Sequence, residues 1–276
     1  MENNNYITEL GVASDLSWLA GKAIRDIYFG SMEKIIKADG TPVTNADLNA
    51  NKIILEGLES AFPDDGIVSE ESQSQGTDRE RVWYIDPLDG TRGFTERSDQ
   101  FAVHIGLAQE QQPVLGIVYK PTTGEMYFAV KGRGAFYRTP NLQTMGDVKK
   151  LTIDPIMNHE LKIVVDKQAL QKSYWPQVEA AFLPQRVMIS GSEGLRMAKI
   201  AENIADLHFS NSPNRCGTWD ICAPHIIVQE AGGYIQYLDG SPVLYQGQRG
   251  LEKYFVVARD KELGERAQRL LRDILP

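Results

Sequence analysis

Two carboxylates stand three positions apart at the end of an apolar run, and their types suggest metal chemistry. Residues 82–91 read Val-Trp-Tyr-Ile-Asp-Pro-Leu-Asp-Gly-Thr, so Asp86 and Asp89 follow a segment typical of a buried strand. Hard divalent cations such as Mg²⁺ prefer oxygen ligands, and a turn here would expose the Leu88 carbonyl as a third oxygen. Thr91 adds a hydroxyl and a backbone N–H where an anion would bind well. The spacing therefore predicts a cation site with an anion beside it.

The same residues also have a purely structural interpretation, because Asp-Pro and Asp-Gly are common turn formers. Gly90 would permit a close backbone approach in any turn. Either dipeptide alone favours the turn, whereas both together behind a buried strand favour the cation site. Glu70, after a predicted strand at 67–68, could be a solvated acid. Asp47 could equally be an ordinary helix-start acid in the capping box that begins at Thr44.

Three motifs stand in the order found in one enzyme superfamily. They are Glu70-Glu71, Asp86-Pro87-Leu88-Asp89-Gly90-Thr91 and Trp219-Asp220-Ile221-Cys222-Ala223-Pro224. Together with residues 43–47 and the strands predicted after Phe101, they resemble the inositol monophosphatase superfamily of lithium-sensitive, metal-dependent phosphatases over most of the chain. The resemblance implies an α/β (α+β) fold, a five-layered αβαβα sandwich. It also implies Mg²⁺ as cofactor, with two or three ions, and a homodimer as the assembly often seen.

The resemblance further implies a metal-binding role for each matching residue. Glu70, Asp86 and the Leu88 carbonyl would hold a first ion. Asp86, Asp89 and Asp220 would hold a second, so that Asp86 bridges the two. A pair of ions held in this way would activate a water molecule and stabilise charge on the attacking and leaving oxygens.

Other matching residues would handle the phosphate and the water. Gly90 and Thr91 would bind the phosphate group. Thr91 and Asp47 would orient and deprotonate the attacking water, with Glu70 as the third catalytic residue. Asp220 would also contact the substrate.

The chemistry implied by the resemblance requires neither histidine nor cysteine. The four histidines match no metal-ligand spacing, and structural roles are expected for all of them: His104, His159, His208 and His225. His208 and His225 lie near the Trp-Asp motif and are secondary candidates for substrate contact. Cys216 and Cys222, six positions apart, fit neither a zinc site nor a disulfide framework, which predicts free thiols.

The substrate is expected to depend on the loop before the Trp-Asp motif. Members of the superfamily that act on inositol phosphates resemble one another in placing an acid there, whereas residues 207–218 contain none. An acid-free loop with a proline is more similar to the 3′(2′),5′-bisphosphate nucleotidases. Asp89–Phe94 is similar too, although Arg92-Gly93 stand where that branch usually has Lys-Glu. Ser190-Gly191-Ser192, at a strand-to-helix junction, would contact ribose or phosphate, or would form an ordinary helix N-cap.

These observations predict a Mg²⁺-dependent phosphomonoesterase that hydrolyses 3′-phosphoadenosine 5′-phosphate to AMP and phosphate. The alternative on the same machinery is an inositol-1-monophosphatase or a broad sugar-phosphate phosphatase. A third hypothesis, from a different class, is a non-catalytic regulator that binds metal or phosphate. Every position required for catalysis is filled, which favours an enzyme.

The composition of the chain limits the classes of molecule that it is expected to bind. The chain has 276 residues, is 42% hydrophobic and carries a net charge of −8, which disfavours binding to nucleic acid polymers or to an anionic membrane. The resemblance then implies a small phosphorylated substrate as the partner. No signal-peptide pattern and no apolar stretch long enough to span a bilayer is visible, which predicts a cytoplasmic protein.

Periodicity predicts the elements that would position the site. Helices are expected at 6–29, from the Thr44 cap to 61, and at 168–182 (with a break or restart at Pro176), 195–201, 219–231 and 260–274. Strands are expected at 67–68, 82–86, 101–108, 113–120, 125–130, 135–137, 161–165, 187–189, 234–238 and 254–257. Residues 34–41 read as a hairpin or loop. A polar segment at 139–150 suggests an α+β half, 1–140, with most metal ligands, and an α/β half, 141–276, with Asp220 and the substrate-selecting loop.

Overall fold

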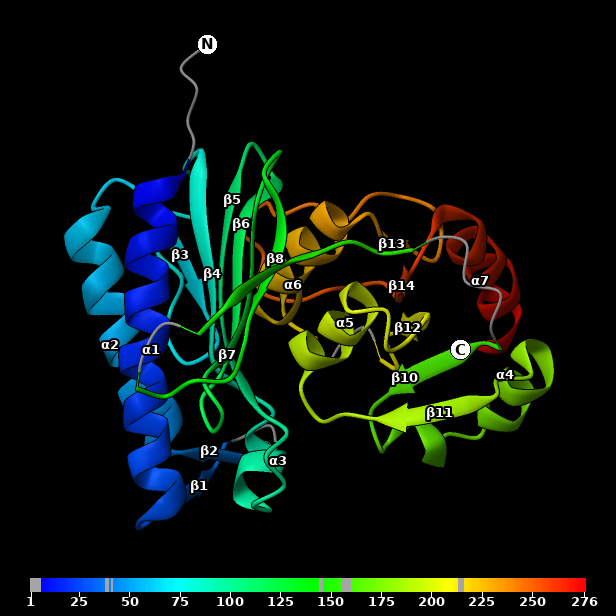
Figure 1. Cartoon of the computed structure of the whole chain (residues 1–276), viewed down its shortest axis with the longest axis horizontal. Coiled ribbons are helices and arrows are strands. Elements are labelled where there is room, and N and C mark those ends of the chain that lie inside the picture. Colours follow the sequence, from blue (N-terminus) through cyan, green and yellow to red (C-terminus); the bar gives the residue numbers. More distant parts are fainter. Residues whose placement is uncertain (1–5, 38–39, 41, 144–145, 155–159, 213–215) are drawn as a thin grey trace.

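The chain forms five layers of helix and sheet (Figure 1). The computed structural model describes residues 6–37, 40, 42–143, 146–154, 160–212 and 216–276. Helices α1 (Ile7–Phe29) and α2 (Asn45–Ala61) cover one face of a seven-stranded sheet. Between that sheet and a five-stranded one lie α5 (Glu193–Ala201) and α6 (Thr218–Ala231), and the outer face of the second sheet carries α4 (Trp175–Phe182) and α7 (Lys261–Ile274). The predicted αβαβα sandwich is confirmed.

The larger sheet is mostly antiparallel. Its strands are Gly66–Ser69 (β3), Arg81–Asp89 (β4), Ala102–Gln109 (β5), Gln112–Lys120 (β6), Glu125–Val130 (β7), Gly134–Arg138 (β8) and Val148–Leu151 (β9). They lie in sequence order, and only the pair β3 and β4 is parallel. Because β3 and β4 run in the same direction, the acids that follow β3 and end β4 lie at the same edge of the sheet.

The smaller sheet is mixed. Its strands are Lys162–Val165 (β10), Arg186–Ile189 (β11), Leu207–Phe209 (β12), Tyr234–Tyr237 (β13) and Phe255–Ala258 (β14), in the order β11-β10-β12-β14-β13. Strands β10, β11 and β12 are parallel, so their carboxyl ends share one edge. A short antiparallel pair, β1 (Lys34–Ile36) and β2 (Pro42–Thr44), forms the predicted hairpin, and a five-residue helix, α3 (Thr91–Thr95), begins where the anion-binding turn was expected.

Apolar spacing explains how the outer helices pack. In α1 the residues Ala13, Ala20 and Ile24 are completely buried, at the helical spacing read from the sequence. Helix α2 begins with the predicted capping box, in which Thr44 and Asp47 satisfy each other's backbone and side-chain groups. This cap places the Asp47 side chain at the end of α2 that faces the site.

Two glycines allow α6 to lie directly on the larger sheet. Gly106 and Gly116 are partners on the neighbouring strands β5 and β6. A Cβ atom on Gly106 would lie 2.7 Å from the Ala223 backbone nitrogen, and one on Gly116 would lie 2.2 Å from its carbonyl oxygen. Any larger residue would therefore push α6 away from the sheet. This close approach brings Asp220, in the first turn of α6, to the end of β4.

The structure differs from the predicted elements in three ways. The strand predicted at 82–86 continues to Asp89, so both acids belong to it. In the helix predicted at 168–182 the restart expected at Pro176 is confirmed, since α4 begins at Trp175, but the preceding part forms only a 3₁₀ turn, Ala169–Gln171, and residues 172–174 are not helical. Strands β9 and β12 were not predicted, because Val148–Leu151 is half charged and mostly exposed and Leu207–Phe209 is only three residues long.

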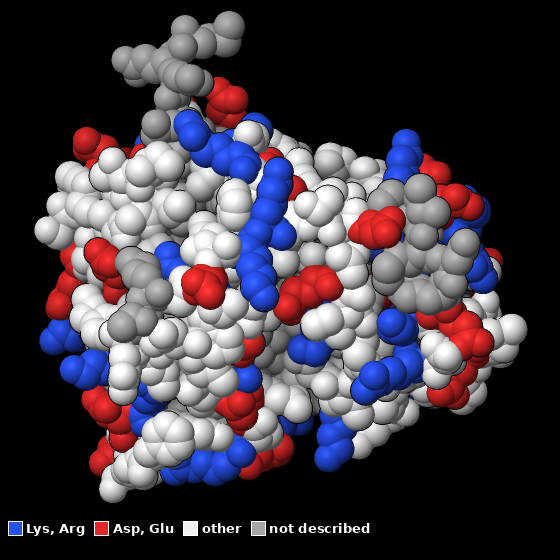
Figure 2. Space-filling model, viewed as in Figure 1, with Lys and Arg blue, Asp and Glu red and all other residues white. Residues whose placement is uncertain are grey.

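Part of some predictions lies outside the described residues. These parts are 213–215 of the substrate loop, 38, 39 and 41 of the hairpin, 144 and 145 of the polar segment, and His159. Within the described part of the chain, no helix combines the length and apolar character needed to cross a membrane. Acidic and basic side chains are mixed over the face seen in Figure 2.

Candidate metal and phosphate site

A bulge in β4 brings the two predicted metal-ligand acids to one side of the strand. Asp86 pairs with His104 and Asp89 pairs with Ala102, so three steps along β4 match two steps along β5. In a regular strand, side chains three positions apart point to opposite faces. The extra residue in the bulge turns the Asp89 side chain back to the face on which Asp86 lies. The Asp-Pro-Leu-Asp spacing therefore works through a bulge, not through the turn that the sequence suggested.

Three carboxylates converge at this edge of the sheet. One oxygen from each of Asp86, Asp89 and Asp220 lies within 4.8 Å of the others. Burial, followed by the charges of Glu70 and Asp89, raises the pKa of Asp86 well above its usual value. Burial, followed by the charges of Asp89 and Glu70, does the same for Asp220. The cluster has excess negative charge and offers only oxygen atoms, which fits a hard cation such as Mg²⁺.

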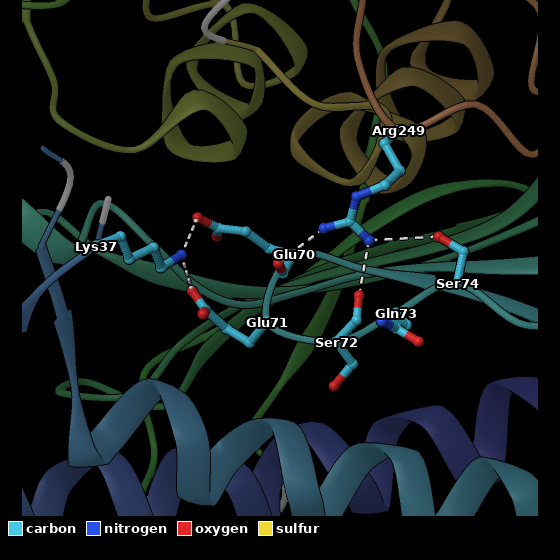
Figure 3. A pocket seen from close by; sticks show the side chains of 7 residues that line it. All are labelled: Lys37, Glu70, Glu71, Ser72, Gln73, Ser74 and Arg249. Carbon is cyan, nitrogen blue, oxygen red and sulfur yellow. Dashed lines mark hydrogen bonds and ion pairs between the residues drawn. The ribbon is translucent and has the colours of Figure 1, made fainter. Parts of the chain in front are cut away.

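Glu70 lies beside this cluster but is held by a lysine. Its backbone N–H donates to the Ile85 carbonyl at 3.1 Å, which fixes it next to the end of β4. The Lys37 ammonium contacts the Glu70 carboxylate at 3.2 Å and that of Glu71 at 2.6 Å (Figure 3). Burial raises the pKa of Glu70 to about 7, although Lys37 opposes the shift. These groups border an open hollow of about 510 Å³.

Thr91 and Asp47 form the predicted pair, and both are fixed. The Thr91 hydroxyl lies 2.9 Å from Asp47 Oδ1 and 3.2 Å from the Leu88 carbonyl oxygen. Asp47 Oδ2 accepts from the backbone N–H and the hydroxyl of Thr44. Burial raises the pKa of Asp47, while these hydrogen bonds lower it. The carboxylate is therefore oriented so that one oxygen can accept a proton from Thr91.

Gly90 connects the strand to the helix that begins at Thr91. Its φ of 93° lies in the left-handed region, and a Cβ atom there would lie 2.5 Å from the Gln100 carbonyl oxygen. Only glycine satisfies both conditions. The backbone at this point is consequently free of side-chain atoms, as a phosphate contact would require.

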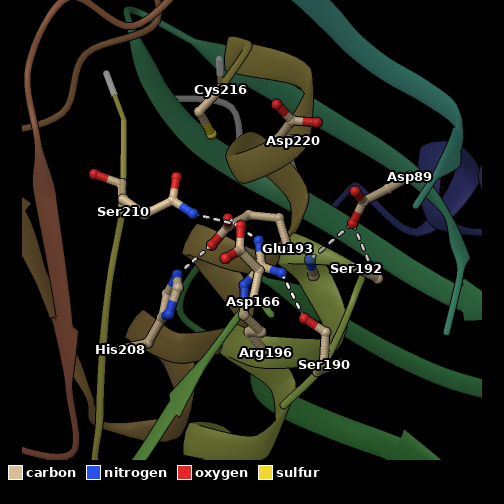
Figure 4. A network of polar contacts seen from close by, with 12 residues as sticks. Asp89, Asp166, Ser190, Ser192, Glu193, Arg196, His208, Ser210, Cys216 and Asp220 are labelled. Carbon is tan, nitrogen blue, oxygen red and sulfur yellow. Dashed lines mark hydrogen bonds and ion pairs between the residues drawn. The ribbon is translucent and has the colours of Figure 1, made fainter. Parts of the chain in front are cut away.

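The serine-glycine-serine segment supports Asp89 directly. Ser192 caps α5, and its hydroxyl donates to Asp89 Oδ2 at 2.5 Å (Figure 4). The backbone N–H of Gly194 donates to the same oxygen at 3.2 Å. Ser190 is buried, and Gly191 donates to the Gln100 side chain. The N-cap interpretation of this segment is confirmed, while contact of these three residues with substrate stays a prediction.

Two buried histidines lie next to the site, His104 and His208, and the sequence predicted a structural role for both, with substrate contact as a secondary possibility for His208. The Nε2 atom of His104 lies 3.2 Å from Asp89 Oδ2, and a Cβ on Gly194 would lie 2.2 Å from that nitrogen. Burial lowers the pKa of His104, while Asp89, Glu193 and the backbone at the start of α6 oppose the shift. Pro224 has no N–H to donate to the Asp220 carbonyl, which leaves that carbonyl open to such a contact. His104 thus lies between β4 and the start of α6, the two elements that carry the predicted metal-ligand acids. From the sequence, only its pairing with Asp86 on the neighbouring strand could have indicated this.

The second histidine belongs to a buried charged network in Figure 4. His208 Nε2 lies 2.5 Å from Glu193 Oε1, and its Nδ1 faces the Val164 carbonyl at 2.9 Å. Arg196 pairs with Glu193 and donates to the Ser190 carbonyl at 2.7 Å. Burial alone would raise the pKa of Glu193, but Arg196 and His208 outweigh it and hold that pKa well below the usual range. The network fixes the start of α5, and therefore the donors to Asp89.

Other predicted candidates lie in the core. His225 is buried, with Nδ1 3.0 Å from the Tyr245 hydroxyl, and burial lowers its pKa to about 3. Cys216 and Cys222 are free, as predicted. These positions fit the structural roles expected for them.

Sequence and structure comparisons agree with this geometry. Residues 7–275 match the inositol monophosphatase family. A 3′(2′),5′-bisphosphate nucleotidase, CysQ of Aggregatibacter actinomycetemcomitans, is 33% identical over 236 residues, covering 84% of this chain and 85% of that protein. A histidinol-phosphatase of Chlorobaculum parvum is 33% identical over 238 residues, covering 82% and 84%. The crystal structure of CysQ from Bacteroides thetaiotaomicron superposes with a TM-score of 0.78 at 25% identity, covering 94% and 100%.

Proposed function

Because this chain belongs to the inositol monophosphatase family and is a phosphatase, we propose that it is a Mg²⁺-dependent 3′(2′),5′-bisphosphate nucleotidase. Its reaction would be hydrolysis of 3′-phosphoadenosine 5′-phosphate to AMP and inorganic phosphate. The observation that carries the proposal is the convergence of three buried or half-buried carboxylates beside the Thr91–Asp47 pair. The unbalanced charge of that cluster calls for cations, and the pair beside it can take a proton.

The residues that would hold Mg²⁺ are Glu70, Asp86, Asp89, Asp220 and the Leu88 carbonyl. Bound there, the ions would supply Lewis-acid chemistry, activating water and neutralising charge that develops on the phosphoryl oxygens. Asp86, the most deeply buried of the four acids, lies between the others and suits a shared ligand. Lys37 would have to leave the Glu70 carboxylate before that group could serve, because its ammonium contacts it now.

Proton transfer falls to Thr91 and Asp47. The Thr91 hydroxyl can accept a hydrogen bond from a water molecule while it donates one to Asp47 Oδ1, 2.9 Å away. A raised pKa makes the Asp47 carboxylate a better base than an exposed aspartate. Since the other Asp47 oxygen is held by Thr44, the accepting oxygen stays aimed at the hydroxyl. Gly90 leaves room for the phosphate at the backbone.

Two observations favour the nucleotide as substrate. The relative CysQ is named as a bisphosphate nucleotidase, and the described residues 207–212 and 216–218 contain no acid that would bind inositol hydroxyls. The histidinol-phosphatase is as similar in sequence, so a phosphorylated amino alcohol is the second candidate. Inositol 1-phosphate and other sugar phosphates form the third.

Phosphate release from each ester tests the proposal. The purified chain is assayed with Mg²⁺ on 3′-phosphoadenosine 5′-phosphate, histidinol phosphate and inositol 1-phosphate, and the nucleotide should show the highest kcat/KM. An Asp89→Asn variant serves as the control for contaminating phosphatases, because its amide oxygen can still accept from Ser192 and Gly194. Preference for another ester refutes the nucleotide assignment. Absence of turnover on all esters favours the non-catalytic regulator.

A further inference from the structure

One arginine outside the predicted site holds the loop that carries Glu70. Arg249 lies in the segment between β13 and β14, far from Glu70 in the sequence (Figure 3). Its Nη1 donates to the carbonyls of Ser69 at 2.8 Å and Ser72 at 2.7 Å, and also reaches the Ser74 hydroxyl at 3.3 Å. Its Nη2 donates to the Glu70 carbonyl at 2.9 Å. The planar fork of one guanidinium therefore fixes four points of a single loop.

The same arginine is joined to the start of α6, which carries Asp220. Its guanidinium carbon lies 4.7 Å from the centre of the Trp219 ring. Its backbone carbonyl accepts from the Thr218 N–H at 2.9 Å, and the Gln248 carbonyl accepts from the Thr218 hydroxyl at 2.6 Å. Arg249 thus contacts both elements that bring distant acids, Glu70 and Asp220, to the end of β4.

The arginine acts on the backbone and not on the metal-ligand carboxylates. All four of its described hydrogen bonds on the loop end on carbonyl or hydroxyl oxygens, while the Glu70 carboxylate contacts Lys37. A guanidinium paired with that carboxylate would compete with a cation, whereas one that holds the Glu70 carbonyl does not. The Glu70 N–H is held by Ile85 and its carbonyl by Arg249, so the backbone on both sides of this residue is fixed.

We propose that Arg249 is a positioning residue that sets the distance between Glu70 and Asp220, and thereby the affinity of the site for divalent cations. The inference rests on the proposed function, because it takes these acids as metal ligands. Loss of the fork would let the Glu70 loop move relative to α6 while the Asp86–Asp89 pair, held by β4 itself, stays in place. Cation affinity should therefore fall more than the rate at saturating metal.

The test compares Arg249→Ala and Arg249→Lys with a matched control, Arg79→Ala. Arg79 also donates to two loop carbonyls, those of Pro63 and Asp65, but that loop carries no site residue. Direct Mn²⁺ binding is measured by electron paramagnetic resonance of the free ion, together with Tm and the Mg²⁺ dependence of phosphate release. Both Arg249 variants should bind Mn²⁺ about 10- to 100-fold more weakly, the usual effect of losing a residue that orients a ligand.

Two outcomes decide the inference, and a third concerns only the proposed function. Weaker Mn²⁺ binding in the Arg249 variants, with Tm no lower than in Arg79→Ala and with partial recovery on adding free guanidinium, supports it. Unchanged Mn²⁺ affinity in Arg249→Lys overturns it, since lysine cannot reproduce the fork, and this variant decides if Arg249→Ala does not fold. A wild-type chain that binds Mn²⁺ but releases no phosphate contradicts the proposed function and leaves the binding comparison for Arg249 valid.

Discussion

Replacing Asp86 by Asn should make the metal-free protein more stable and remove its response to Mg²⁺. Asp86 lies within 4.8 Å of Asp89 and Asp220, and at that distance two unit charges repel by about 3.5 kcal/mol at an effective dielectric constant near 20. Asparagine has the same shape and can still accept from the Leu88 N–H, now at 2.9 Å. The substitution therefore removes charge repulsion without opening a cavity.

The net gain will be smaller than the sum of the repulsions. The raised pKa values of Asp86 and Asp220 mean that proton uptake already relieves part of the strain in the wild type. We expect about 2 kcal/mol, within the usual range for single substitutions. At about 2–4 °C per kcal/mol for a chain of roughly this size, Tm should rise by about 4–8 °C.

Magnesium should make the wild type more stable than the Asp86→Asn variant, the reverse of their order without metal. A cation at about 100 times its Kd stabilises a protein by about 2.7 kcal/mol, so Mg²⁺ should raise the wild-type Tm by about 5–10 °C. The variant lacks the shared carboxylate and should gain little. Thermal unfolding followed by circular dichroism, with a chelator or with Mg²⁺, measures both effects and can be repeated with Mn²⁺.

Asp65→Asn is the matched control. The Asp65 carboxylate is largely shielded from solvent and already has partners. It accepts hydrogen bonds from the Arg81 guanidinium at 3.0 Å and from the Trp83 indole N–H at 2.8 Å. Its replacement should cost about 1–3 kcal/mol and leave the Mg²⁺ response intact. A lower Tm for Asp86→Asn than for the wild type in chelator, or an equal Mg²⁺ shift in both, would refute the reasoning about the cluster.

Three further predictions concern the same site. Without metal, the stability of the folded chain should fall as pH rises from about 5 to 8. The reason is that Glu70, with a pKa of about 7, and Asp86 hold protons in the folded state that the unfolded chain has already released. Thermal unfolding of chelator-treated protein across this pH range should show the decrease, and Mg²⁺ should make it smaller. Thr91→Val, which keeps the side-chain size but has no hydroxyl, should lower kcat by about 10²–10⁴-fold with little change in Mn²⁺ binding; loss of metal binding instead would mean that Thr91 supports the metal-ligand backbone. His104→Phe keeps a ring against Gly194 but loses the nitrogen near Asp89, so Mg²⁺ affinity measured by calorimetry should fall about tenfold. An unchanged affinity would mean that His104 contributes only packing.

Sequence reasoning was most successful where local chemistry and position coincide. The Asp-Pro-Leu-Asp run, the capping box at Thr44 and the apolar period of α1 each depend on residues close together in the chain, and all appear in the structure. The convergence of Asp220 with β4 depends on two glycines in different strands, Gly106 and Gly116. No local pattern indicates that these glycines form one track under α6. Resemblance to a family supplied that convergence, and spacing alone did not.

The supporting residues were beyond sequence reasoning for a physical reason. A lone buried histidine or arginine carries no periodic signal, and its partner is fixed only when the layers assemble. Arg249 lies 179 positions from Glu70, and Glu193 is 15 positions from His208. Their significance follows from tertiary contacts that no spacing rule contains.

The three clustered acids share one structural arrangement, which explains how a repulsive cluster can be kept ready for cations. Asp86 accepts the Leu88 N–H, Asp220 accepts the Gly217 N–H at 2.5 Å, and Asp89 accepts from Ser192. In each case these donors hold one carboxylate oxygen in place, although the three acids repel one another. Orientation is thus supplied by neutral donors that do not compensate the charge. The site is preorganised in geometry but uncompensated in charge, and this combination favours a bound divalent cation over a rearranged metal-free state.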